Sequence, residues 1–276
     1  MKTISTTLGV SRSNLVERLS GARAARKPRY NKLSDLEVLP DIKAVCTERP
    51  TYGYRRVTAI LNRQRQRERM PLLNHKRAYR LMKQNQLLLQ RHTGRPTRTH
   101  DGKVVSIKSN LRWCSDTFTI RCFNGEKVEV AFSLDTCDRE VISYVATASA
   151  TTGEMIRDLM TQSLEARFGS QSMLAHPIEW LSDNGPPYIA HETRSFGASL
   201  GFIVCNTPSY SPESNGASEA FVKTFKRDYV YLNQLDNPSM VLRQLSGWFD
   251  DYNENAPHKG LNMRSPREFR RTFLTN

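Results

Sequence analysis

The chain has 276 residues, of which 38% are hydrophobic and 25% are charged, and this size and composition predict a folded protein of about two domains. No stretch approaches the roughly 18–20 consecutive apolar residues of a membrane span, and the first residues lack the apolar run of a signal peptide. The five cysteines are odd in number and widely spaced. These features predict reduced thiols in a cytoplasmic protein, and they disfavour secretion and membrane insertion.

The net charge of +14 is divided unequally along the chain. Residues 1–110 carry a net +18, whereas residues 111–276 carry a net −4. A strongly basic half attracts a phosphate backbone, so the asymmetry predicts a nucleic-acid-binding module joined to a region that needs carboxylates. The alternative, a generally basic protein without a polyanionic partner, is disfavoured by the sharp difference between the two halves.

Residues 1–30 begin with a small-residue turn that leads into Ser11, a suitable N-cap, and an amphipathic stretch with Leu15, Val16 and Leu19. This stretch resembles the turn and second helix of a helix-turn-helix, whose first helix would then lie before Met1. Four basic residues between positions 23 and 29 form a basic arm. A disordered basic tail is an equally good interpretation of this region.

Residues 31–92 predict a small helical DNA-binding domain. Helical spacing of apolar residues predicts three helices, whose inward residues are Leu36, Leu39, Ile42 and Val45, then Val57, Ile60 and Leu61, and then Ala78, Tyr79, Leu81 and Met82. Residues 50–56 separate the first helix from the second, and Pro71 ends the second. Asn74 caps the third. The outward residues of the third helix include Lys76, Arg77 and Arg80, and such a basic face suits a DNA groove, although basic helix faces are more often simply solvated.

Residues 93–109 lack periodicity and are rich in Gly, Pro, Thr and Arg, which is typical of a linker. From residue 110 onward the hydrophobic period changes. We expect strands at 113–120, 128–134 and 141–146, a helix at 155–168, a strand at 178–182, a helix at 191–200, a strand at 202–205 and two final helices. This order predicts an α/β domain over 110–276, with a mixed five-stranded sheet flanked by helices.

Three acidic residues of the α/β domain are candidates for chemistry. Asp116 lies within the first strand, Asp183 closes the fourth strand, and Glu219 lies on the helix after the fifth strand. In an open α/β sheet, sites form beyond the carboxyl ends of strands, and the helix can bring Glu219 to the same edge.

The helix around Glu219 has two distinct faces. Glu219, Lys223 and Lys226 repeat at i, i+4 and i+7 on one face, whereas Phe221 and Phe225 lie on the other. If the apolar face packs against the sheet, Glu219 faces a groove in which it can bind a metal ion. Lys223 and Lys226 then lie where a phosphate backbone passes. A surface ion pair between Glu219 and Lys223, worth at most ~0.5 kcal/mol, is the better interpretation of this helix taken alone.

Eight short motifs accompany these residues along the chain. They are PTYGYRRV (50–57), RWCSD (112–116), LDTCDRE (134–140), SDNG (182–185), SPESNG (211–216), FVKT (221–224), KRDY (226–229) and SPRE (265–268). Their joint order resembles the DDE transposases and retroviral integrases, and is most similar to the second-reading-frame transposases of insertion-sequence family three, in the subgroup of insertion element two. The resemblance extends across nearly the whole chain and implies an RNase H-like integrase core preceded by a small all-α helix-turn-helix-like domain.

The resemblance implies that Asp116, Asp183 and Glu219 are the catalytic residues and the ligands of two Mg²⁺ ions, for which Mn²⁺ is expected to substitute. Such an ion pair, roughly 3.5–4 Å apart, stabilises the attacking and leaving oxygens of phosphodiester chemistry, and Mg²⁺ prefers hard oxygen ligands. Phe118 stands where many relatives have Thr, as is expected in this subgroup. The residues flanking Glu219 differ slightly from the expected pattern, but its register is intact.

The resemblance also implies partners. The chain is expected to bind terminal inverted repeats and target DNA, to nick and join strands in a bacterial cytoplasm, at the nucleoid when bound to DNA, and to form a homo-oligomer. It is further expected to act with an upstream-frame DNA-binding protein, possibly as a frameshift fusion, which suits the truncated helix-turn-helix. The expected DNA-binding residues are Lys226, Lys223, Arg227, Arg55, Arg56, Lys76, Arg77 and Arg80.

Two alternative functions stay open. A nuclease of the same fold would cleave without joining, but it needs no second DNA-positioning module. A DNA-binding regulator with an inactive catalytic half is disfavoured by the intact carboxylates. Asp135 and Asp138 are rival carboxylates, and we expect them to be structural because they lie in a turn between paired strands. His92 and His100 are not followed by a Cys-x-x-Cys motif, so no zinc site is predicted.

Overall fold

The computed structural model describes residues 2–19, 34–90, 106–169, 173–174, 176–207 and 216–274. The strands are β1 (Arg112–Arg121), β2 (Lys127–Asp135), β3 (Val141–Thr147), β4 (Ile178–Ser182) and β5 (Phe202–Asn206). The helices of the same half are α6 (Gly153–Phe168), α7 (Pro186–Ile189), α8 (His191–Ser199), α9 (Gly216–Asp228), α10 (Pro238–Asn255) and α11 (Pro266–Leu274). Every strand and helix predicted for this half is present, and α7 and α11 are additional.

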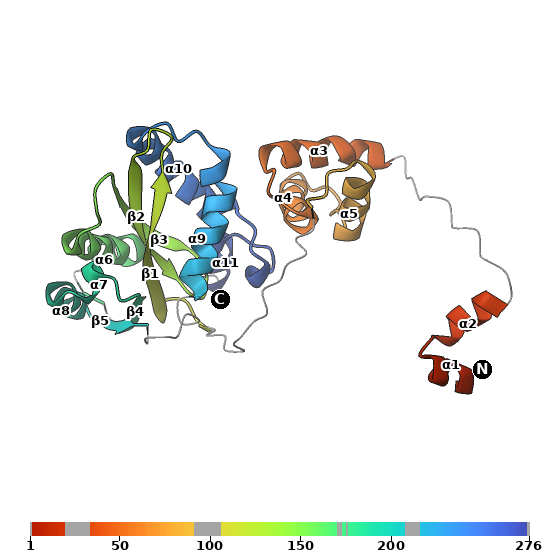
Figure 1. Cartoon of the computed structure of the whole chain (residues 1–276), viewed down its shortest axis with the longest axis horizontal. Helices are drawn as coiled ribbons and strands as arrows, with labels where there is room; N and C mark the ends of the chain where they lie inside the picture. Colours follow the sequence, from red (N-terminus) through yellow and green to blue (C-terminus); the bar gives the residue numbers. More distant parts are fainter. Residues whose placement is uncertain are drawn as a thin grey trace.

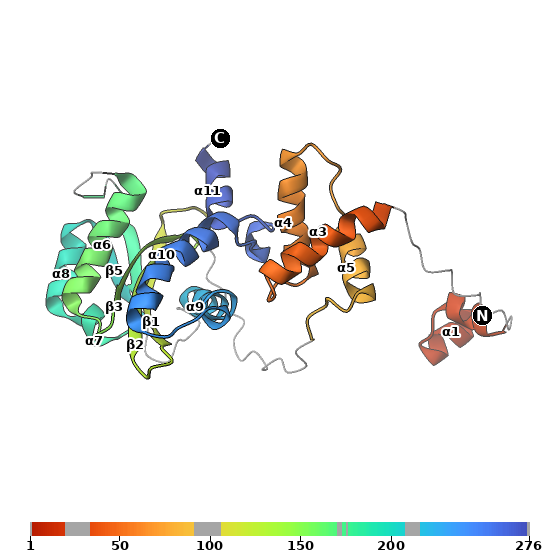
Figure 2. The same ribbon diagram turned by 90° about the horizontal axis from the view of Figure 1, so that it is seen from above.

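The five strands form one mixed sheet in the order β3-β2-β1-β4-β5. β1 and β3 are antiparallel to β2, whereas β4 is parallel to both β1 and β5. Helices α6, α7 and α8 cover one face of the sheet, and α9 and α10 cover the other (Figure 1); the view from above in Figure 2 shows the same division. The sheet is therefore the middle layer of three, as predicted.

Side chains of β1 alternate between two hydrophobic cores, because successive residues of a strand point to opposite faces of the sheet. Trp113 packs in the core on the α6 side, whereas Cys114 and Phe118 pack in the core on the α9 and α10 side. Aromatic rings fill much of the second core; the ring centroids of Phe225 and Phe249 lie 4.6 Å apart.

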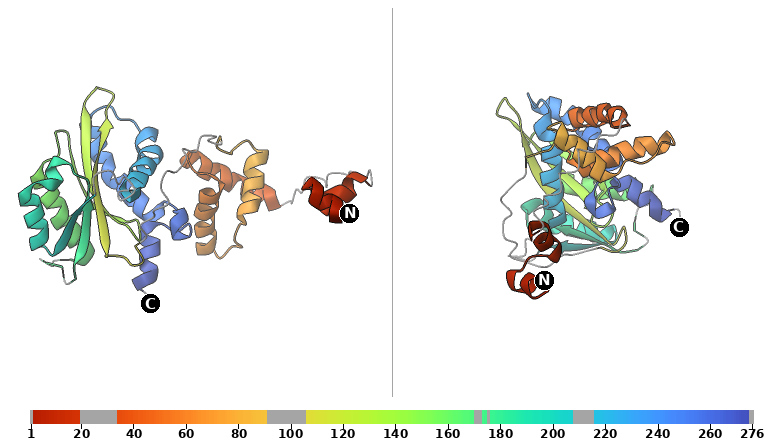
Figure 3. Two further views of the ribbon diagram at one scale, coloured as in Figure 1. Left: turned by 60° about the horizontal axis from the view of Figure 1, so that its bottom comes forward. Right: turned by 90° about the vertical axis from the view of Figure 1, so that its right-hand side faces the viewer.

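The N-terminal half is helical. Its helices are α1 (Lys2–Leu8), α2 (Arg12–Leu19), α3 (Ser34–Glu48), α4 (Tyr54–Arg67) and α5 (His75–Gln84). Helices α3, α4 and α5 share one core that includes Ile42, Val57 and Met82. The side chain of Asn74 accepts a 2.8 Å hydrogen bond from the Lys76 N–H, which confirms the predicted cap of α5. Figure 3 shows this three-helix bundle beside the α9–α11 side of the sheet domain.

Two predicted inward residues of the bundle are exposed, and these predictions are wrong. Leu36 is 71% exposed because the buried positions of α3 start one residue earlier, at Asp35, and continue at Val38. Asp35 takes this inward position because two arginines of α5 bind its carboxylate. Tyr79 is 40% exposed and packs edge-on against Tyr54, with ring centroids 5.1 Å apart.

The extreme N-terminus also differs from expectation. Residues Lys2–Leu8 form α1, so the helix that precedes the turn at Gly9 lies within the chain and not before Met1. The predicted cap is confirmed, because the Ser11 hydroxyl accepts a 3.3 Å hydrogen bond from the Asn14 N–H. The basic arm, most of the linker and the loop before α9 fall at 20–33, 91–105 and 208–215, outside the described residues.

All five cysteines are unpaired, as predicted. None of the described helices combines the length and the hydropathy that a transmembrane segment needs.

Candidate active site

Asp116 and Asp183 occupy neighbouring positions on one face of the sheet. In the parallel pairing of β1 with β4, the last partners are Ser115 and Ser182, and the residue that follows each of them in the chain is an aspartate. Asp116 follows the alternation of Cys114 and therefore lies on the face that α9 and α10 cover. The structure thus brings the first two predicted acidic residues together at the carboxyl end of β4, where sites form in α/β sheets.

A hydrogen-bonded turn holds Asp183. Its Oδ1 accepts the Gly185 N–H at 3.0 Å, and its backbone carbonyl accepts a 2.9 Å hydrogen bond from Asn206 of β5. A Cβ at Gly185 would lie 3.0 Å from the same Oδ1, so this position accommodates glycine best. The other oxygen of Asp183 has no hydrogen-bond partner among the described residues. The SDNG motif therefore presents one carboxylate oxygen for another ligand.

Tyr188 of α7 lies close to both aspartates, and sequence reasoning did not identify it. Its hydroxyl is 3.2 Å from the hydroxyls of Ser115 and Thr117. Burial raises the pKa of Tyr188, and the negative charges of Asp116 and Asp183 raise it further. Tyr188 therefore stays protonated as a neutral hydrogen-bonding group behind the site. No spacing pattern marks it, because its contact with β1 depends on the turn of the chain after β4.

Helix α9 presents the third predicted acidic residue. Phe221 and Phe225 are buried against the sheet, as predicted, and their rings pack on Phe118 of β1 at 6.5 and 5.8 Å. Glu219, in the first turn, remains exposed, and its Oε2 lies 3.6 Å from Nζ of Lys223. The two faces of α9 are therefore as the sequence predicts, and the surface ion pair of the alternative interpretation is formed in this structure.

Lys226 lies over β1, against Phe118. Its Nζ is 5.6 Å from the ring centroid of Phe118, two residues beyond Asp116 on the same face of the strand. Burial lowers the pKa of Lys226 from its ordinary value. Phe118 thus gives the lysine an aromatic surface to rest on.

The three carboxylates do not form a single cluster. Within the described ranges, no group of three His, Cys, Asp or Glu side chains is close enough to hold one metal ion. Lys223 supplies the countercharge of Glu219 in this conformation, and the convergence of Asp116, Asp183 and Glu219 on a pair of metal ions stays a prediction. Asp116 and Asp183 still fit a hard cation in chemistry and position, because both are carboxylates on neighbouring strands.

The rival carboxylates Asp135 and Asp138 form buried ion pairs inside the fold. Arg167 of α6, with a side chain only 1% exposed, lies 3.4 Å from Asp135, 3.2 Å from Asp138 and 2.7 Å from Glu140. Burial and the charge of Asp135 raise the pKa of Asp138 to about 7. These contacts agree with the structural role expected for Asp135 and Asp138.

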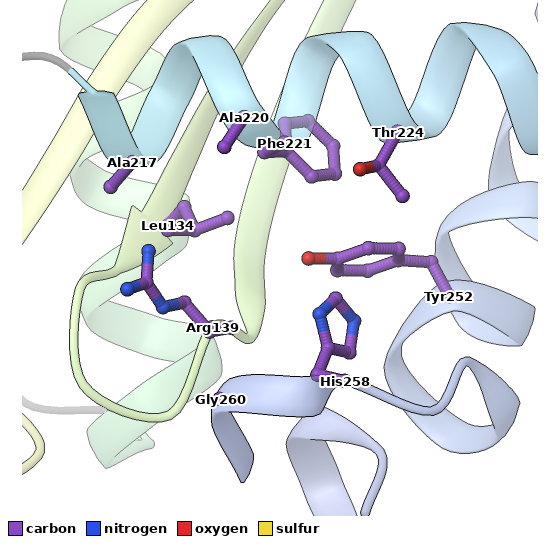
Figure 4. A pocket seen from close by; sticks show the side chains of 9 residues that line it. All are labelled: Leu134, Arg139, Ala217, Ala220, Phe221, Thr224, Tyr252, His258 and Gly260. Atoms are coloured by element: carbon purple, nitrogen blue, oxygen red, sulfur yellow. The ribbon is translucent and has the colours of Figure 1, made fainter. Parts of the chain in front are cut away.

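A cavity of about 200 Å³ lies on another flank of α9, between the helix and the 3-10 turn Lys259–Leu261 (Figure 4). Arg139, Tyr252 and His258 line it together with apolar side chains, and no carboxylate is among its lining residues. Burial, followed by the charges of Arg56 and Arg139, lowers the pKa of His258 to about 4. The cavity is therefore unsuited to a divalent cation and is separate from the candidate active site.

Comparisons with known proteins give the family. Residues 107–212 and 203–266 match two families described as integrase core domain, and residues 33–95 match an HTH-like domain. Transposase InsD of insertion element IS2D, from Escherichia coli (strain K12), is 44% identical over 278 residues, which cover 99% of this chain and 91% of that protein. The chain belongs to the insertion-sequence transposases. Its integrase-core segments contain Asp116, Asp183 and Glu219.

The fold of this transposase is the RNase H-like integrase fold, with an HTH-like domain before it. A chain of the simian T-cell lymphotropic virus intasome in complex with PP2A regulatory subunit B56 gamma aligns with a TM-score of 0.49 and 18% identity, covering 83% of this chain and 73% of that one. The HTLV-2 integrase catalytic core domain in complex with magnesium aligns with a TM-score of 0.43 and 18% identity, covering 59% of this chain and 97% of that one.

Seven of the eight cations predicted to bind DNA fall into two groups in this transposase, and the eighth, Lys226, lies half-buried over Phe118. Arg55 and Lys76 are exposed, and no ion pair engages either of them among the described residues. The other group makes ion pairs within the chain: Arg77 and Arg80 with Asp35, Arg56 and Arg227 with Asp228, and Lys223 with Glu219. DNA contact stays a prediction for all of them, and the structure adds a structural role for the second group.

Proposed function

We propose that this transposase binds the terminal inverted repeats of its element and cuts and joins DNA strands through Asp116, Asp183 and Glu219. The observation that carries the proposal is the placement of Asp116 and Asp183 at neighbouring strand positions, on the sheet face over which α9 packs. Members of the integrase core family match the segments that contain all three residues.

Two Mg²⁺ ions, or Mn²⁺ in their place, fit this set of ligands. Asp116 and Asp183 offer hard oxygen donors, and Asp183 has an oxygen without a described hydrogen bond. Glu219 is held only by an exposed ion pair with Lys223, an interaction worth at most ~0.5 kcal/mol, so its transfer to a cation costs little. When bound, the ions would stabilise the attacking and leaving oxygens of phosphodiester chemistry.

The reaction has two steps of the same chemistry. In cutting, the oxygen of water bonds to phosphorus at the element end, and the bond from phosphorus to the 3′ oxygen breaks, which leaves a 3′-OH. In joining, that 3′ oxygen bonds to a target phosphorus, and the 3′ oxygen of the target strand leaves. Lys226, held over Phe118 two residues beyond Asp116 on β1, contacts the DNA backbone at this site.

The proposal includes partners. Arg55 and Lys76 on the HTH-like domain contact the repeat, and copies of the chain assemble to bridge two ends. An upstream-frame protein, joined by frameshifting, supplies further DNA contacts. The basic charge of residues 1–110 supports this division of roles between the two halves.

A strand-transfer assay tests the proposal. A labelled duplex that ends in the terminal repeat is incubated with plasmid DNA and Mg²⁺ or Mn²⁺, and wild type is compared with Glu219→Gln. Glu192→Gln is the matched control, because Glu192 is also exposed and pairs with Arg157 at 3.5 Å. We expect joined product from wild type and Glu192→Gln and none from Glu219→Gln.

The other outcomes are informative. Cleavage without joining would favour the nuclease. Product only from a fusion with the upstream frame would keep the catalytic assignment. It would also show that the DNA contacts supplied by the upstream frame limit the reaction of this chain alone. No product from either protein would favour the inactive regulator.

A further inference from the structure

The motif at 50–56 lies where the HTH-like domain meets the catalytic domain. Its neighbour Arg49, directly after α3, binds Asp251 of α10 with two nitrogens, at 2.5 and 2.7 Å. The Tyr229 hydroxyl donates a 2.8 Å hydrogen bond to the same carboxylate. Two parallel N–H···O bonds from one guanidinium give the strongest and most directional geometry for an ion pair.

A second carboxylate at this junction is buried. The side chain of Asp228, the last residue of α9, is 1% exposed. Its oxygens accept hydrogen bonds from Thr51 at 2.7 Å and from Arg56 at 2.8 Å, both in the HTH-like domain, and from Arg227 beside it. Burial alone would raise the pKa of Asp228, but these donors hold it below its ordinary value.

A third contact extends the junction to the C-terminal region. Arg63 of α4 donates to the carbonyls of Asn255 and Met263, at 2.7 and 3.2 Å, and pairs with Glu268 of α11 at 2.7 Å. We call the carboxylates Asp228 and Asp251, with Arg49, Thr51, Arg56 and Arg63, the interdomain clasp. Exposed ion pairs contribute little, but a buried carboxylate that loses its donors is strongly destabilised. The clasp is therefore a specific contact between the two domains that is costly to break.

The clasp is attached to the catalytic helix. Glu219 and Asp228 are the first-turn acid and the last residue of α9, about 13 Å apart at 1.5 Å per residue. Lys226, over Phe118 of β1, is two residues before Asp228. The HTH-like domain is therefore anchored on the element that carries the third candidate ligand.

We propose that the interdomain clasp sets where the DNA strand is cut relative to the sequence that the HTH-like domain binds. Asp228 and Asp251 are positioning residues: they fix the exposed cations Arg55 and Lys76 at one offset from the catalytic carboxylates. The motif at 50–56 is thus a docking segment, and Arg56 serves the clasp. This inference rests on the proposed function for its consequence on cutting, whereas the clasp itself is testable without activity.

The variants are charge reversals of the best-defined pair: Arg49→Glu, Asp251→Arg, and both together. Arg65→Glu is the matched control, because it removes the same charge from the same domain, and its partner Asp41 belongs to that domain. The double variant re-forms an ion pair of opposite polarity, so its recovery separates a lost contact from a failure to fold.

Hydrogen exchange of the full chain tests the clasp without DNA. We expect Arg49→Glu to speed exchange about tenfold or more in segments 49–56 and 251–256, with recovery in the double variant and no change in Arg65→Glu. Equal exchange in Arg49→Glu and wild type would overturn the clasp. This result does not depend on transposase activity.

The cut positions on a labelled terminal-repeat duplex test the consequence. Wild type and Arg65→Glu should cut at one position, Arg49→Glu should scatter its cuts over neighbouring phosphates, and the double variant should restore the single position. An unchanged single position in Arg49→Glu, or no recovery in the double variant, would overturn the positioning role. If neither the wild-type chain nor its fusion with the upstream frame cuts, the proposed function fails, and the exchange result still decides the clasp.

Discussion

Two sets of three carboxylates in the catalytic domain have opposite surroundings. Asp135, Asp138 and Glu140 are buried around Arg167, with side chains no more than 6% exposed. Asp116 lies within β1, Asp183 directly follows β4 and Glu219 lies on α9, and no arginine pairs with Asp183 or Glu219 among the described residues.

The surroundings of a carboxylate decide whether it serves the fold or can take part in chemistry. A charge buried with a fixed cation contributes to the fold and cannot be exchanged for a ligand without a large cost. A partly exposed carboxylate with a weak partner can accept a metal ion. Each set consists of two aspartates and one glutamate. The environment of the side chains, and not their residue type, therefore decides which set is structural and which is available for chemistry.

The largest expected effect separates the two sets by stability. Arg167→Met leaves three buried carboxylates without their common partner, and we expect a loss of about 3–5 kcal/mol in the free energy of unfolding. Asp183→Asn, at the candidate site, should leave that free energy nearly unchanged while it abolishes strand transfer. Denaturant unfolding measures both variants, and equal stability losses would break the comparison.

A pH effect on stability is expected to be smaller. The pKa of His258 is about 4 in the fold, below the ordinary value of 6.5, because burial and nearby arginines disfavour its charged form. The unfolded chain therefore binds the proton more readily, and the contribution of His258 to stability falls as the pH drops from 6.5 to 4.

The raised pKa of Asp138 acts in the opposite sense, since its stabilising contribution falls as the pH rises from about 3.8 to about 7. Because the two groups act in opposite senses, the contribution of His258 to stability is obtained from the difference between wild type and a variant that lacks this histidine. Thermal unfolding of wild type and of His258→Gln at several pH values provides it. The two curves should approach each other as the pH falls from 6.5 to 4; a constant offset would contradict the assigned pKa.

The smallest expected effect concerns DNA. Lys76→Ala removes an exposed cation of α5 and should weaken DNA binding across sequences and lower the slope of log affinity against log salt by about one. Lys127→Ala is the control, because Lys127 is exposed but already paired with Glu129 at 2.7 Å in the catalytic domain. Equal salt slopes for the two variants would remove Lys76 from the interface.

Local chemistry explains what the sequence predicts well. The strands follow from alternating apolar residues, α5 and α10 begin at the capping residues Asn74 and Asn237, and the buried face of α9 follows from Phe221 and Phe225. The family motifs locate the three candidate carboxylates.

Contacts between distant residues explain what the sequence misses. Leu36 is exposed because Asp35 binds arginines more than 40 residues away. Arg56 pairs with a carboxylate 172 residues later, and Tyr188 meets β1 about 70 residues before it. No helical or strand period carries such information, so the sequence does not predict that a basic residue of a basic domain pairs with a buried aspartate.

Metal binding tests the central claim most directly. Electron paramagnetic resonance of Mn²⁺ in the presence of the terminal-repeat duplex would compare wild type with Asp116→Asn/Asp183→Asn and with Asp138→Asn. We predict that wild type and Asp138→Asn remove free Mn²⁺ from solution and that the double variant does not. Mn²⁺ binding that survives the loss of both Asp116 and Asp183 would contradict the assignment of the two carboxylate sets. So would binding that vanishes in Asp138→Asn while the protein remains folded.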